Sequence, residues 1–352
     1  MTLSTGWIEQ RLPFGAVVHG LNLRDRPDAP TISAIESEVA RHGFLVFPNQ
    51  SLPGDTLTRV SEYFGSGVLA ARHTTHSEAV HDDVLRLSNQ GQHGVRAVGQ
   101  QWHADGSFER AVFSHVIFHA QHMPPIGGGT AIADLGAAHD ALPARLRTVW
   151  ASCASVNAFS GAVHPLIHKH PLTGRRLLFL HLGQTGAIVC WNSTAGAEAC
   201  RAEKGRRSRA PHRGQSAMDP SIGPSPGHDQ RALGPQQVSE LQRTFDALLS
   251  RTGIQTTYTY STVGGAGDLL LLDNLAVAHR SPAEAHDPAN GLRIIHRTTV
   301  AGTTDIDPPP ASGLPPFLYI WGANPLEGSG VWQGSDEYGA GWRWNNSRVL
   351  RN

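Results

Sequence analysis

From residue 66 onward, the sequence consists of short apolar runs separated by turn-forming residues. Runs of this kind occur at 84–87, 114–119 and 129–133, and Gly, Asn and Pro bound them. Repeated short strands favour an antiparallel sandwich or barrel over a parallel sheet, in which helices would separate successive strands. The sequence therefore predicts a mainly β fold with helices packed outside it.

Apolar residues at helical spacing occur on both sides of this β region. Residues 30–42, which precede Gly43, and residues 235–251 each carry an apolar stripe typical of a helix. Pro48 is expected to end an early strand, and Gly267-Asp268 to form a turn before a later one. Other expected elements are helices at 51–64 and beyond Pro143, a hairpin with its turn at 171–174, and strands at 14–24, 44–47, 177–180, 254–260, 269–272 and 293–300.

Two segments differ in composition from the rest of the chain. Residues 192–234 are rich in Gly, Ala, Ser, Pro and Arg, and such a segment cannot bury enough surface to offset its ordering entropy. We predict one domain over residues 1–302 with a mobile surface insertion at about 192–234. Its basic cluster at 204–209 is typical of a solvated loop, with a nucleic-acid or lipid contact as the alternative. Residues 303–352 are Trp-rich, and we expect this C-terminal extension to pack on the domain or on another subunit.

Composition argues against several classes of function. Lys and Arg together number 29, as do Asp and Glu, so no net charge attracts nucleic acid or an acidic membrane. No apolar run approaches the roughly 18 residues of a membrane span, and residues 1–7 lack a secretory-signal pattern. Cys153, Cys190 and Cys200 are odd in number and widely spaced, which argues against disulfides and a Cys-type zinc site. We expect a cytoplasmic protein without nucleic-acid or membrane partners, and leave open whether it forms a homo-oligomer.

The candidate chemistry centres on His103 and Asp105. On an extended strand, residues i and i+2 point to the same face, so this pair could aim a nitrogen and an oxygen at one point. His279, after the apolar run at 269–272, could supply a third ligand, and two His with one carboxylate form the facial triad of non-haem iron(II) oxygenases. Taken singly, His103 could be a core histidine, Asp105 could cap the turn at Gly106, and His279 could simply end a strand.

Three further motifs follow this His-x-Asp pattern in a definite order. The four are Trp102-His103-Ala104-Asp105, Gly127-Gly128-Gly129-Thr130, Asp273-Asn274 with His279, and Arg293-Ile294-Ile295-His296-Arg297. Together they make the chain resemble the taurine/2,4-dichlorophenoxyacetate dioxygenase family of Fe(II)- and 2-oxoglutarate-dependent oxygenases. Residues 15–20 and 43–50 also look like that family, and the resemblance covers roughly residues 7–190 and 235–302.

The resemblance implies a fold, a ligand set and co-substrates. The fold would be a double-stranded β-helix, a jelly-roll core with the iron at the mouth between its sheets. His103, Asp105 and His279 would hold Fe(II), and 2-oxoglutarate and O2 would be consumed with release of succinate and CO2. Thr130 and Arg293 would bind the far carboxylate of 2-oxoglutarate, for which the planar fork of arginine is suited. Halogenating relatives lack the iron-binding carboxylate, so Asp105 favours hydroxylation or another oxidation.

Arg297 is the candidate for binding the prime substrate. On one strand it would share a face with Arg293 and reach the same cavity. A buried guanidinium requires a negative partner, which a small carboxylate or sulfonate substrate would supply. The alternative is an ion pair with an Asp or Glu of the chain itself.

The expected substrate pocket departs from that of taurine dioxygenase. That enzyme uses a His and a Tyr ahead of the iron motif and an Asn just before it. Ala71, Thr74 and Gly99 stand at the matching positions, with His73 as a candidate substitute. These small residues leave room for an aryl or longer alkyl acid.

Two other functions also fit parts of the pattern. A cupin-type binding or storage protein without turnover would not need Thr130 and Arg293 at family positions. A zinc or manganese hydrolase could use the same three ligands, but it would need a general base and would not depend on 2-oxoglutarate.

Overall fold

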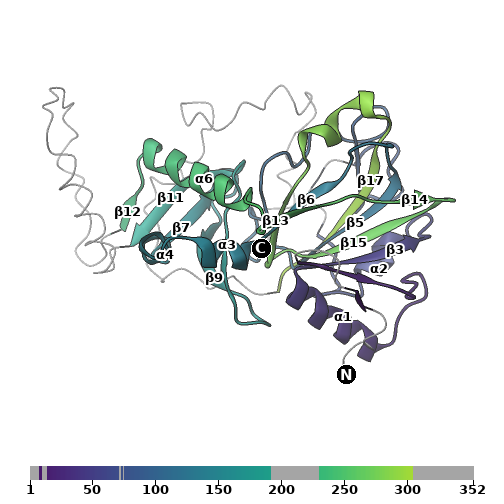
Figure 1. Ribbon diagram of the computed structural model, residues 1–352, viewed down its shortest axis with the longest axis horizontal. Helices are drawn as coiled ribbons and strands as arrows, with labels where there is room; N and C mark the ends of the chain where they lie inside the picture. The colour runs from purple at the N-terminus through teal and green to yellow at the C-terminus, as the bar shows by residue number, and fades with distance from the viewer. Residues whose placement is uncertain (1–7, 10–13, 71–72, 74, 192–229, 304–352) are drawn as a thin grey trace, which may run out of the picture.

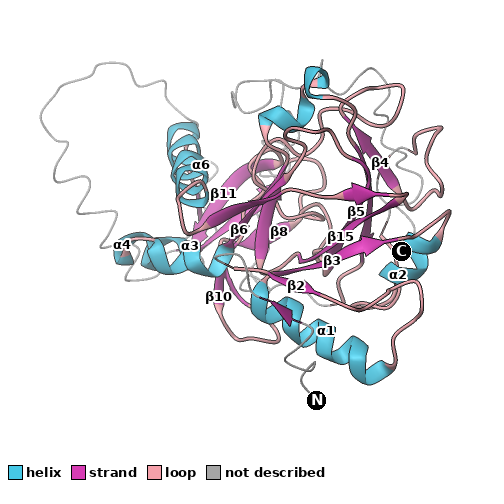
Figure 2. Cartoon of the chain, turned by 45° about the vertical axis from the view of Figure 1, so that its right-hand side comes forward, coloured by secondary structure: helices cyan, strands magenta, loops and turns pink. Residues whose placement is uncertain are grey.

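The computed structural model describes residues 8–9, 14–70, 73, 75–191 and 230–303 of the 352-residue chain. Within these ranges strands outnumber helices, and the strands form four sheets (Figures 1 and 2). The prediction of a mainly β fold with flanking helices is confirmed. The two segments of unusual composition lie largely outside the described residues.

The largest sheet has eight strands, and their order is far from chain order. Along the main path the order is β1 (Ile8–Glu9), β2 (Ala16–Val18), β3 (Phe44–Gln50), β15 (Ala266–Asp273), β5 (His115–His122), β17 (Ile294–Val300) and β4 (Leu85–Ser88), while β14 (Thr262–Val263) pairs with β15. Its neighbours pair antiparallel except for the parallel pair β2 and β3.

A three-stranded sheet packs against it, and β6 (Thr130–Asp134) is its central strand. β13 (Gln255–Tyr258) and β16 (Val277–Arg280) pair on either side of β6. Because side chains alternate along a strand, Ile132 joins the core shared with the large sheet. Ala131 and Ala133 join the core on the other side. The small sheet is thus buried on both faces.

Helices α1 (Ala29–His42) and α2 (Thr56–Ser61) cover the outer face of the large sheet (Figure 1). The Asp28 carboxylate accepts a hydrogen bond from Thr31 N at 2.9 Å and caps the start of α1. Gly43, with φ of 81°, ends it, and its N–H donates to Val39 O. The predicted helix at 30–42 is confirmed, whereas the helix expected at 51–64 is limited to α2.

The remaining strands and α-helices form a second cluster, which lies to the left of the large sheet in Figure 1. Its apolar core includes Trp102 and the apolar face of α6 (Pro235–Leu249). This helix confirms the one predicted at 235–251. The elements are a sheet of β12 (Gln230–Ala232), β11 (Thr185–Trp191), β7 (Cys153–Asn157) and β8 (Val163–Pro165), the hairpin β9 (Ile167–Lys169) and β10 (Arg176–Leu178), and helices α3 (Leu135–Ala141), α4 (Ala144–Trp150) and α6 (Pro235–Leu249).

Two predicted strand boundaries are wrong for one shared reason. β3 continues through Pro48 to Gln50, and β15 begins at Ala266, so Gly267 lies inside a strand. The pairing of β15 with β3 shifts register between Gly267 and Leu269, and such a bulge tolerates proline. A Cβ on Gly267 would lie 2.0 Å from Ala120 O, so only glycine fits there. The turn expected at Gly267 lies instead at residues 264–265, where both φ values are positive.

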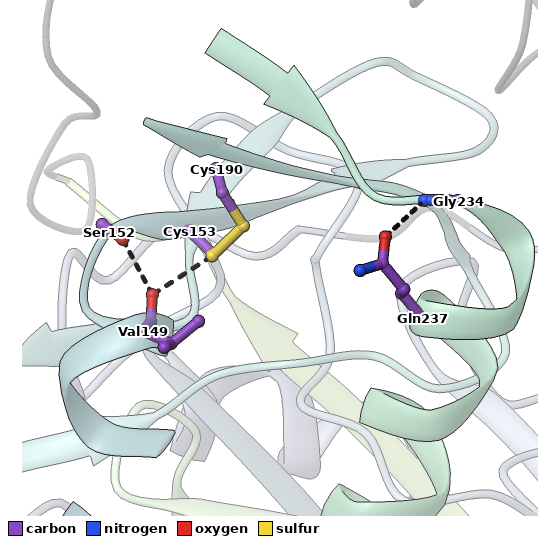
Figure 3. The surroundings of a disulfide bond; sticks show 6 residues. All are labelled: Val149, Ser152, Cys153, Cys190, Gly234 and Gln237. Atoms are coloured by element: carbon purple, nitrogen blue, oxygen red, sulfur yellow. Dashed lines mark hydrogen bonds between the residues drawn. A yellow bond between two sulfur atoms is a disulfide. The ribbon is translucent and has the colours of Figure 1, made fainter. Parts of the chain in front are cut away.

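The expectation that the chain has no disulfide is also wrong. Cys153 on β7 and Cys190 on β11 are cross-strand partners with their Cα atoms 4.0 Å apart, and their sulfur atoms are bonded (Figure 3). Sequence spacing could not reveal this pair, because antiparallel pairing brings together residues 37 positions apart. Disulfides persist mainly in oxidising surroundings, so the bond removes the support that the cysteines gave to a reducing compartment.

An ion pair joins α1 to the large sheet. Glu36 Oε2 lies 3.1 Å from His115 Nε2, and Glu36 Oε1 accepts from Gly65 N at 2.6 Å. Burial alone would raise the pKa of Glu36 and lower that of His115. Their mutual hydrogen bond and opposite charges outweigh burial, so the pKa of Glu36 is lowered and that of His115 is raised. Both groups are therefore charged between their ordinary pKa values of 4.5 and 6.5.

In the part of the chain that the structure describes, no helix is long and apolar enough to cross a membrane. Of the predicted insertion at 192–234, residues 230–232 form β12 and 192–229 lie outside the description. The extension is described only at its first residue, 303. The domain boundaries, the mobility of the insertion and the packing of the extension stay predictions.

Candidate metal centre and adjoining pocket

Backbone pairing brings His103 and His279 together. His279 lies on β16, and His103 lies on the segment between β4 and β5. Each donates its backbone N–H to the carbonyl of the other, at 3.1 Å from His103 and 2.8 Å from His279. The imidazole centroids are 4.3 Å apart. The expected extended strand through His103 is thus an isolated bridge rather than a full ladder strand.

Asn274 holds the loop that carries Asp105. Its Oδ1 accepts from Asp105 N at 2.9 Å, and its Nδ2 donates to Asp105 O at 2.8 Å and to Phe113 O at 2.7 Å. Asn274 has no exposed surface. Gly106 then turns the chain with φ of 81°, and a Cβ there would lie 2.7 Å from the Phe113 ring. The position of Asp105 therefore depends on the segment that leads into β16.

His103, Asp105 and His279 present three ligand atoms to a common point, all within 4.8 Å of one another. Each carboxylate oxygen of Asp105 lies 3.8 Å from one histidine Nε2. His103 Nδ1 lies 2.7 Å from Gln101 O, which fixes the proton on Nδ1 and leaves the Nε2 lone pair for a metal. Among the described residues, these three side chains have ligand atoms close enough together to hold one metal ion.

The protonation states at this centre suit a divalent metal. Burial lowers the pKa of both histidines, and that of His279 lies well below its usual value, so both imidazoles are neutral. Burial alone would raise the pKa of Asp105, but the positive charge of Arg297 is the largest of the causes that lower it to about 2. Two neutral imidazoles and an ionised carboxylate are the donor set of non-haem Fe(II) sites.

Arg297, the predicted substrate anchor, contacts Asp105 directly. Its Nη1 donates to both carboxylate oxygens, at 3.0 and 2.9 Å. The negative partner that a buried guanidinium requires is therefore already present in the protein. Arg297 Nε is buried and has no hydrogen-bond partner among the described residues, so one edge of the guanidinium is not engaged by Asp105.

A pocket of about 440 Å³, counted out to its open mouth, adjoins the metal centre. Arg293 and Thr130, the predicted 2-oxoglutarate ligands, both line it, as do Arg297 and the two histidines. The full lining is Leu87, Ser88, Val95, Ala97, Val98, Gly99, His103, Phe118, Thr130, His279, Arg280, Ser281, His286, Arg293 and Arg297. The structure thus brings six of the seven predicted site residues to one place, since Asp105 contacts three of these lining side chains.

Hydrogen bonds orient the two predicted co-substrate ligands. Arg293 Nε donates to Gly128 O at 2.8 Å, which leaves the outer nitrogens of the guanidinium for another partner. Thr130 Oγ1 lies 2.8 Å from the hydroxyl of Tyr260. Burial raises the pKa of Tyr260 above its usual value, so this phenol is neutral. Arg293 itself precedes β17 by one residue, whereas Arg297 lies within that strand.

Asn89 supports Arg293 in the way that Asn274 supports Asp105. Its Oδ1 accepts from Arg293 N at 2.9 Å, and its Nδ2 donates to Asp287 O at 3.1 Å and to Gly291 O at 2.8 Å. Asn89 thereby fastens the loop between β16 and β17, which includes the 3-10 turns Ala283–His286 and Pro288–Asn290.

His181 is a further imidazole at this centre that the sequence analysis missed. Its ring centroid lies 5.1 Å from that of His103. Burial, and then the nearby His103, lower its pKa to about 3. His181 lies beyond β10 in no motif, so no sequence signal could have selected it. The roles of Asn89, Tyr260 and Asn274 were missed for a similar reason, although Asn274 stands within a quoted motif.

The predicted substrate-pocket positions are described unevenly. His73 is partly buried and does not belong to the lining of the pocket, while Ala71 and Thr74 lie outside the described residues. Gly99 lies directly against the metal centre, because a Cβ there would be 3.0 Å from His103 Cε1. The structure therefore leaves the role of His73 a prediction.

The sequence profile of the family described as "Taurine catabolism dioxygenase TauD, TfdA family" matches residues 7–299. The chain belongs to this family. The predicted resemblance is thereby confirmed, and with it the assignment to the α-ketoglutarate-dependent dioxygenases, which require Fe(II), 2-oxoglutarate and O2.

Curated relatives carry the same activity in their names. The (S)-phenoxypropionate/alpha-ketoglutarate-dioxygenase of Delftia acidovorans is 25% identical over 76% of this chain and 86% of its own length. The alpha-ketoglutarate-dependent 2,4-dichlorophenoxyacetate dioxygenase of Cupriavidus pinatubonensis is 28% identical over 47% of this chain and 70% of its own length.

Solved structures share the fold. A taurine dioxygenase from Burkholderia xenovorans aligns with a TM-score of 0.59 and 21% identity over 84% of this chain and 90% of its own. The structure of AAD-2 in complex with Mn(II) and N-oxalylglycine aligns with a TM-score of 0.61 and 19% identity over 85% of this chain and 99% of its own.

Proposed function

We propose that this dioxygenase hydroxylates a small organic anion, with 2-oxoglutarate and O2 as co-substrates. The observation that carries the proposal is the group His103, Asp105 and His279 beside a pocket that also holds Arg293. One oxygen atom of O2 would enter the substrate C–H bond, and the other would enter succinate as 2-oxoglutarate loses CO2. Iron(II) bound by the three residues would supply the redox chemistry for this exchange.

The protonation states of His103, Asp105 and His279 suit this role before a metal binds. Neutral His103 and His279 would bind the metal through Nε2, and the ionised Asp105 would cancel one of its positive charges. Three protein ligands leave three coordination positions, which is the number required for a chelating 2-oxo acid and O2. Asp105 also fills the position that halogenating relatives leave for chloride, which supports hydroxylation or another oxidation.

Arg293 and Thr130 are proposed to anchor the far carboxylate of 2-oxoglutarate. Arg293 is only 5% exposed, and its outer nitrogens have no carboxylate partner among the described residues. A charge-assisted hydrogen bond from such a guanidinium is among the stronger ones in proteins. The neutral hydroxyl of Thr130, held beside Tyr260, would complete the contact.

Arg297 is proposed to share its guanidinium between Asp105 and an anionic substrate. Only Nη1 contacts Asp105, and the unpartnered Nε shows that this guanidinium has donors to spare. Relatives are named for phenoxypropionate, 2,4-dichlorophenoxyacetate and a sulfate ester, which all carry an anionic group. A carboxylate, sulfonate or sulfate close to the metal would suit this arrangement, and His73 stays a predicted additional contact.

The jelly-roll expectation is part of the same proposal. The large sheet and the β13-β6-β16 sheet share one apolar core, as the two sheets of a double-stranded β-helix would. The metal ligands come from the small sheet and the adjoining bridge, at one end of that core. The likeness to solved taurine dioxygenases supports this reading.

The two alternative functions are less well supported. A cupin-type binding protein would not need a buried Arg293 beside the metal centre. A hydrolase would need a general base next to the metal ligands. His181 is the described histidine closest to that role, but it does not line the pocket.

The decisive test is anaerobic addition of Fe(II) and 2-oxoglutarate, followed by a substrate screen in air. A weak visible charge-transfer band should appear without O2, and succinate should form when a suitable aryl or alkyl acid is present. His279→Ala should lose both signals. Absence of the band together with absence of succinate across the screen would refute the proposal.

A further inference from the structure

Ser281 is a pocket residue that the proposed function leaves without a role. It follows the last residue of β16, two positions after the metal ligand His279. Its backbone N–H donates to Gly99 O at 2.7 Å, which fixes the chain at this point. Since residues i and i+2 share a face in an extended segment, Ser281 is expected to point the same way as His279, about 7 Å further along.

Extending the register of β16 and β6 by one residue puts Ser281 opposite Thr130. β16 pairs antiparallel with β6, with His279 opposite Ile132 and Arg280 opposite Ala131. One more step places Ser281 across from Thr130, where Cβ atoms of facing residues lie about 5 Å apart on the same side of the sheet. Both residues line the pocket. The proposed anchor for the far carboxylate of 2-oxoglutarate therefore has a second hydroxyl beside it.

The Ser281 hydroxyl lacks a hydrogen-bond partner among the residues that the structure describes. Its Oγ is buried, and no described residue forms a hydrogen bond with it. His286 lines the same pocket near Arg293, and its imidazole forms a hydrogen bond with the backbone of Ser281. A buried polar atom without a partner is destabilising. The unpartnered Ser281 hydroxyl can donate, and Arg293 lines the same pocket, so the two together point to a polar, negatively charged ligand.

We propose that the Ser281 hydroxyl donates a hydrogen bond to the far carboxylate of 2-oxoglutarate and so selects a dicarboxylic co-substrate. The inference rests on the proposed function, because it assigns a further ligand to the same co-substrate. Arg293 supplies the charge, while Thr130 and Ser281 supply hydroxyls from two facing strands. A 2-oxo acid without the far carboxylate would leave the Ser281 hydroxyl and the outer nitrogens of Arg293 without a partner among the described residues.

The test is calorimetric titration of the Mn(II)-loaded protein with 2-oxoglutarate and with 2-oxopentanoate, which lacks the far carboxylate. Ser281→Ala should weaken 2-oxoglutarate binding about tenfold to a hundredfold, the usual range for a hydrogen bond to a charged group. Binding of 2-oxopentanoate should stay unchanged. Ser281→Thr keeps the hydroxyl and should retain most of the affinity, and Ser152→Ala, whose hydroxyl donates to Val149 O in α4, is the matched control.

The thermal stability of the ligand-free protein separates a binding role from a structural one, because a structural role predicts that Ser281→Ala is destabilised. Because the hydroxyl has no partner in the described part of the chain, Ser281→Ala should leave the ligand-free protein as stable as the wild type or slightly more stable. Equal weakening of both acids, unchanged 2-oxoglutarate binding, or a destabilised alanine variant would each overturn the role of Ser281. A wild type that binds neither acid would instead overturn the proposed function.

Discussion

Asn274 and Asn89 make the same pattern of three hydrogen bonds in two different parts of the site. Replacing one or the other therefore tests the two parts separately. Each accepts from one backbone N–H and donates to two backbone carbonyls. Asn274 holds the loop of Asp105, while Asn89 holds the loop of Arg293. The perturbation is Asn→Ala at one position or the other.

The cost can be worked out from these contacts. Each alanine leaves one N–H and two carbonyls without their partner, at about 1–3 kcal/mol for each group that stays buried and unpaired. Water entering the space of the lost amide reduces this sum, so we expect a loss near the low end of the range, about 3 kcal/mol of unfolding free energy, for both variants. Partners that orient a metal ligand typically contribute about 10–100-fold to metal affinity.

The two variants should therefore lose different functions at similar cost in stability. Asn274→Ala should weaken Mn(II) binding about 10–100-fold and leave 2-oxoglutarate affinity at saturating metal nearly unchanged. Asn89→Ala should do the reverse. Urea unfolding measures stability, and calorimetric titration measures both affinities. If the two variants lose Mn(II) and 2-oxoglutarate affinity in the same proportion, the division of the site into two separately held halves is refuted.

Three further outcomes follow from the geometry. Arg293→Gln should weaken 2-oxoglutarate binding by two to three decades, since losing one partner of a buried ion pair costs about 3–5 kcal/mol; an unchanged affinity in titration would move the anchor elsewhere. Arg297→Gln should reduce the preference for an active acid over its methyl ester in succinate-release assays, and equal preference in both proteins would clear Arg297 of the role. Glu36→Gln should remove stability that is complete between about pH 4.5 and 6.5, because the pKa of Glu36 is lowered and that of His115 is raised. That contribution falls in acid as Glu36 gains a proton and at higher pH as His115 loses one, so a difference in urea stability that does not vary with pH would contradict it.

The sequence was sufficient to predict helices and strands that are determined by residues near one another in the chain. Helix α1 was predictable because Asp28, the apolar stripe and Gly43 are consecutive in sequence. The strand at 269–272 was predictable as an unbroken apolar run. Pro48 misled the prediction because its tolerance depends on a bulge opposite Gly267, about 220 residues away. A boundary set by a strand partner cannot be read from one strand alone.

The candidate site divides in the same way. His103, Asp105, His279, Thr130 and Arg293 stand in motifs, and the structure brings them to one place. His181, Asn89 and Ser281 have no motif, because their roles come from register and from loops that meet only in the folded chain. Arg297 lines the pocket, but the sequence could not decide between an ion pair with Asp105 and a contact with a substrate anion as its role.

Because Cys153 and Cys190 form a disulfide, the number of free thiols depends on whether the protein folds in an oxidising or a reducing compartment. The chain has three cysteines, and two of them are consumed by this bond. Denaturing cells in the presence of an alkylating reagent, followed by mass measurement of the protein, would therefore distinguish chains in which Cys153 and Cys190 are bonded from chains in which both thiols are free and become labelled. The same count on purified protein would show whether handling in air has changed its redox state.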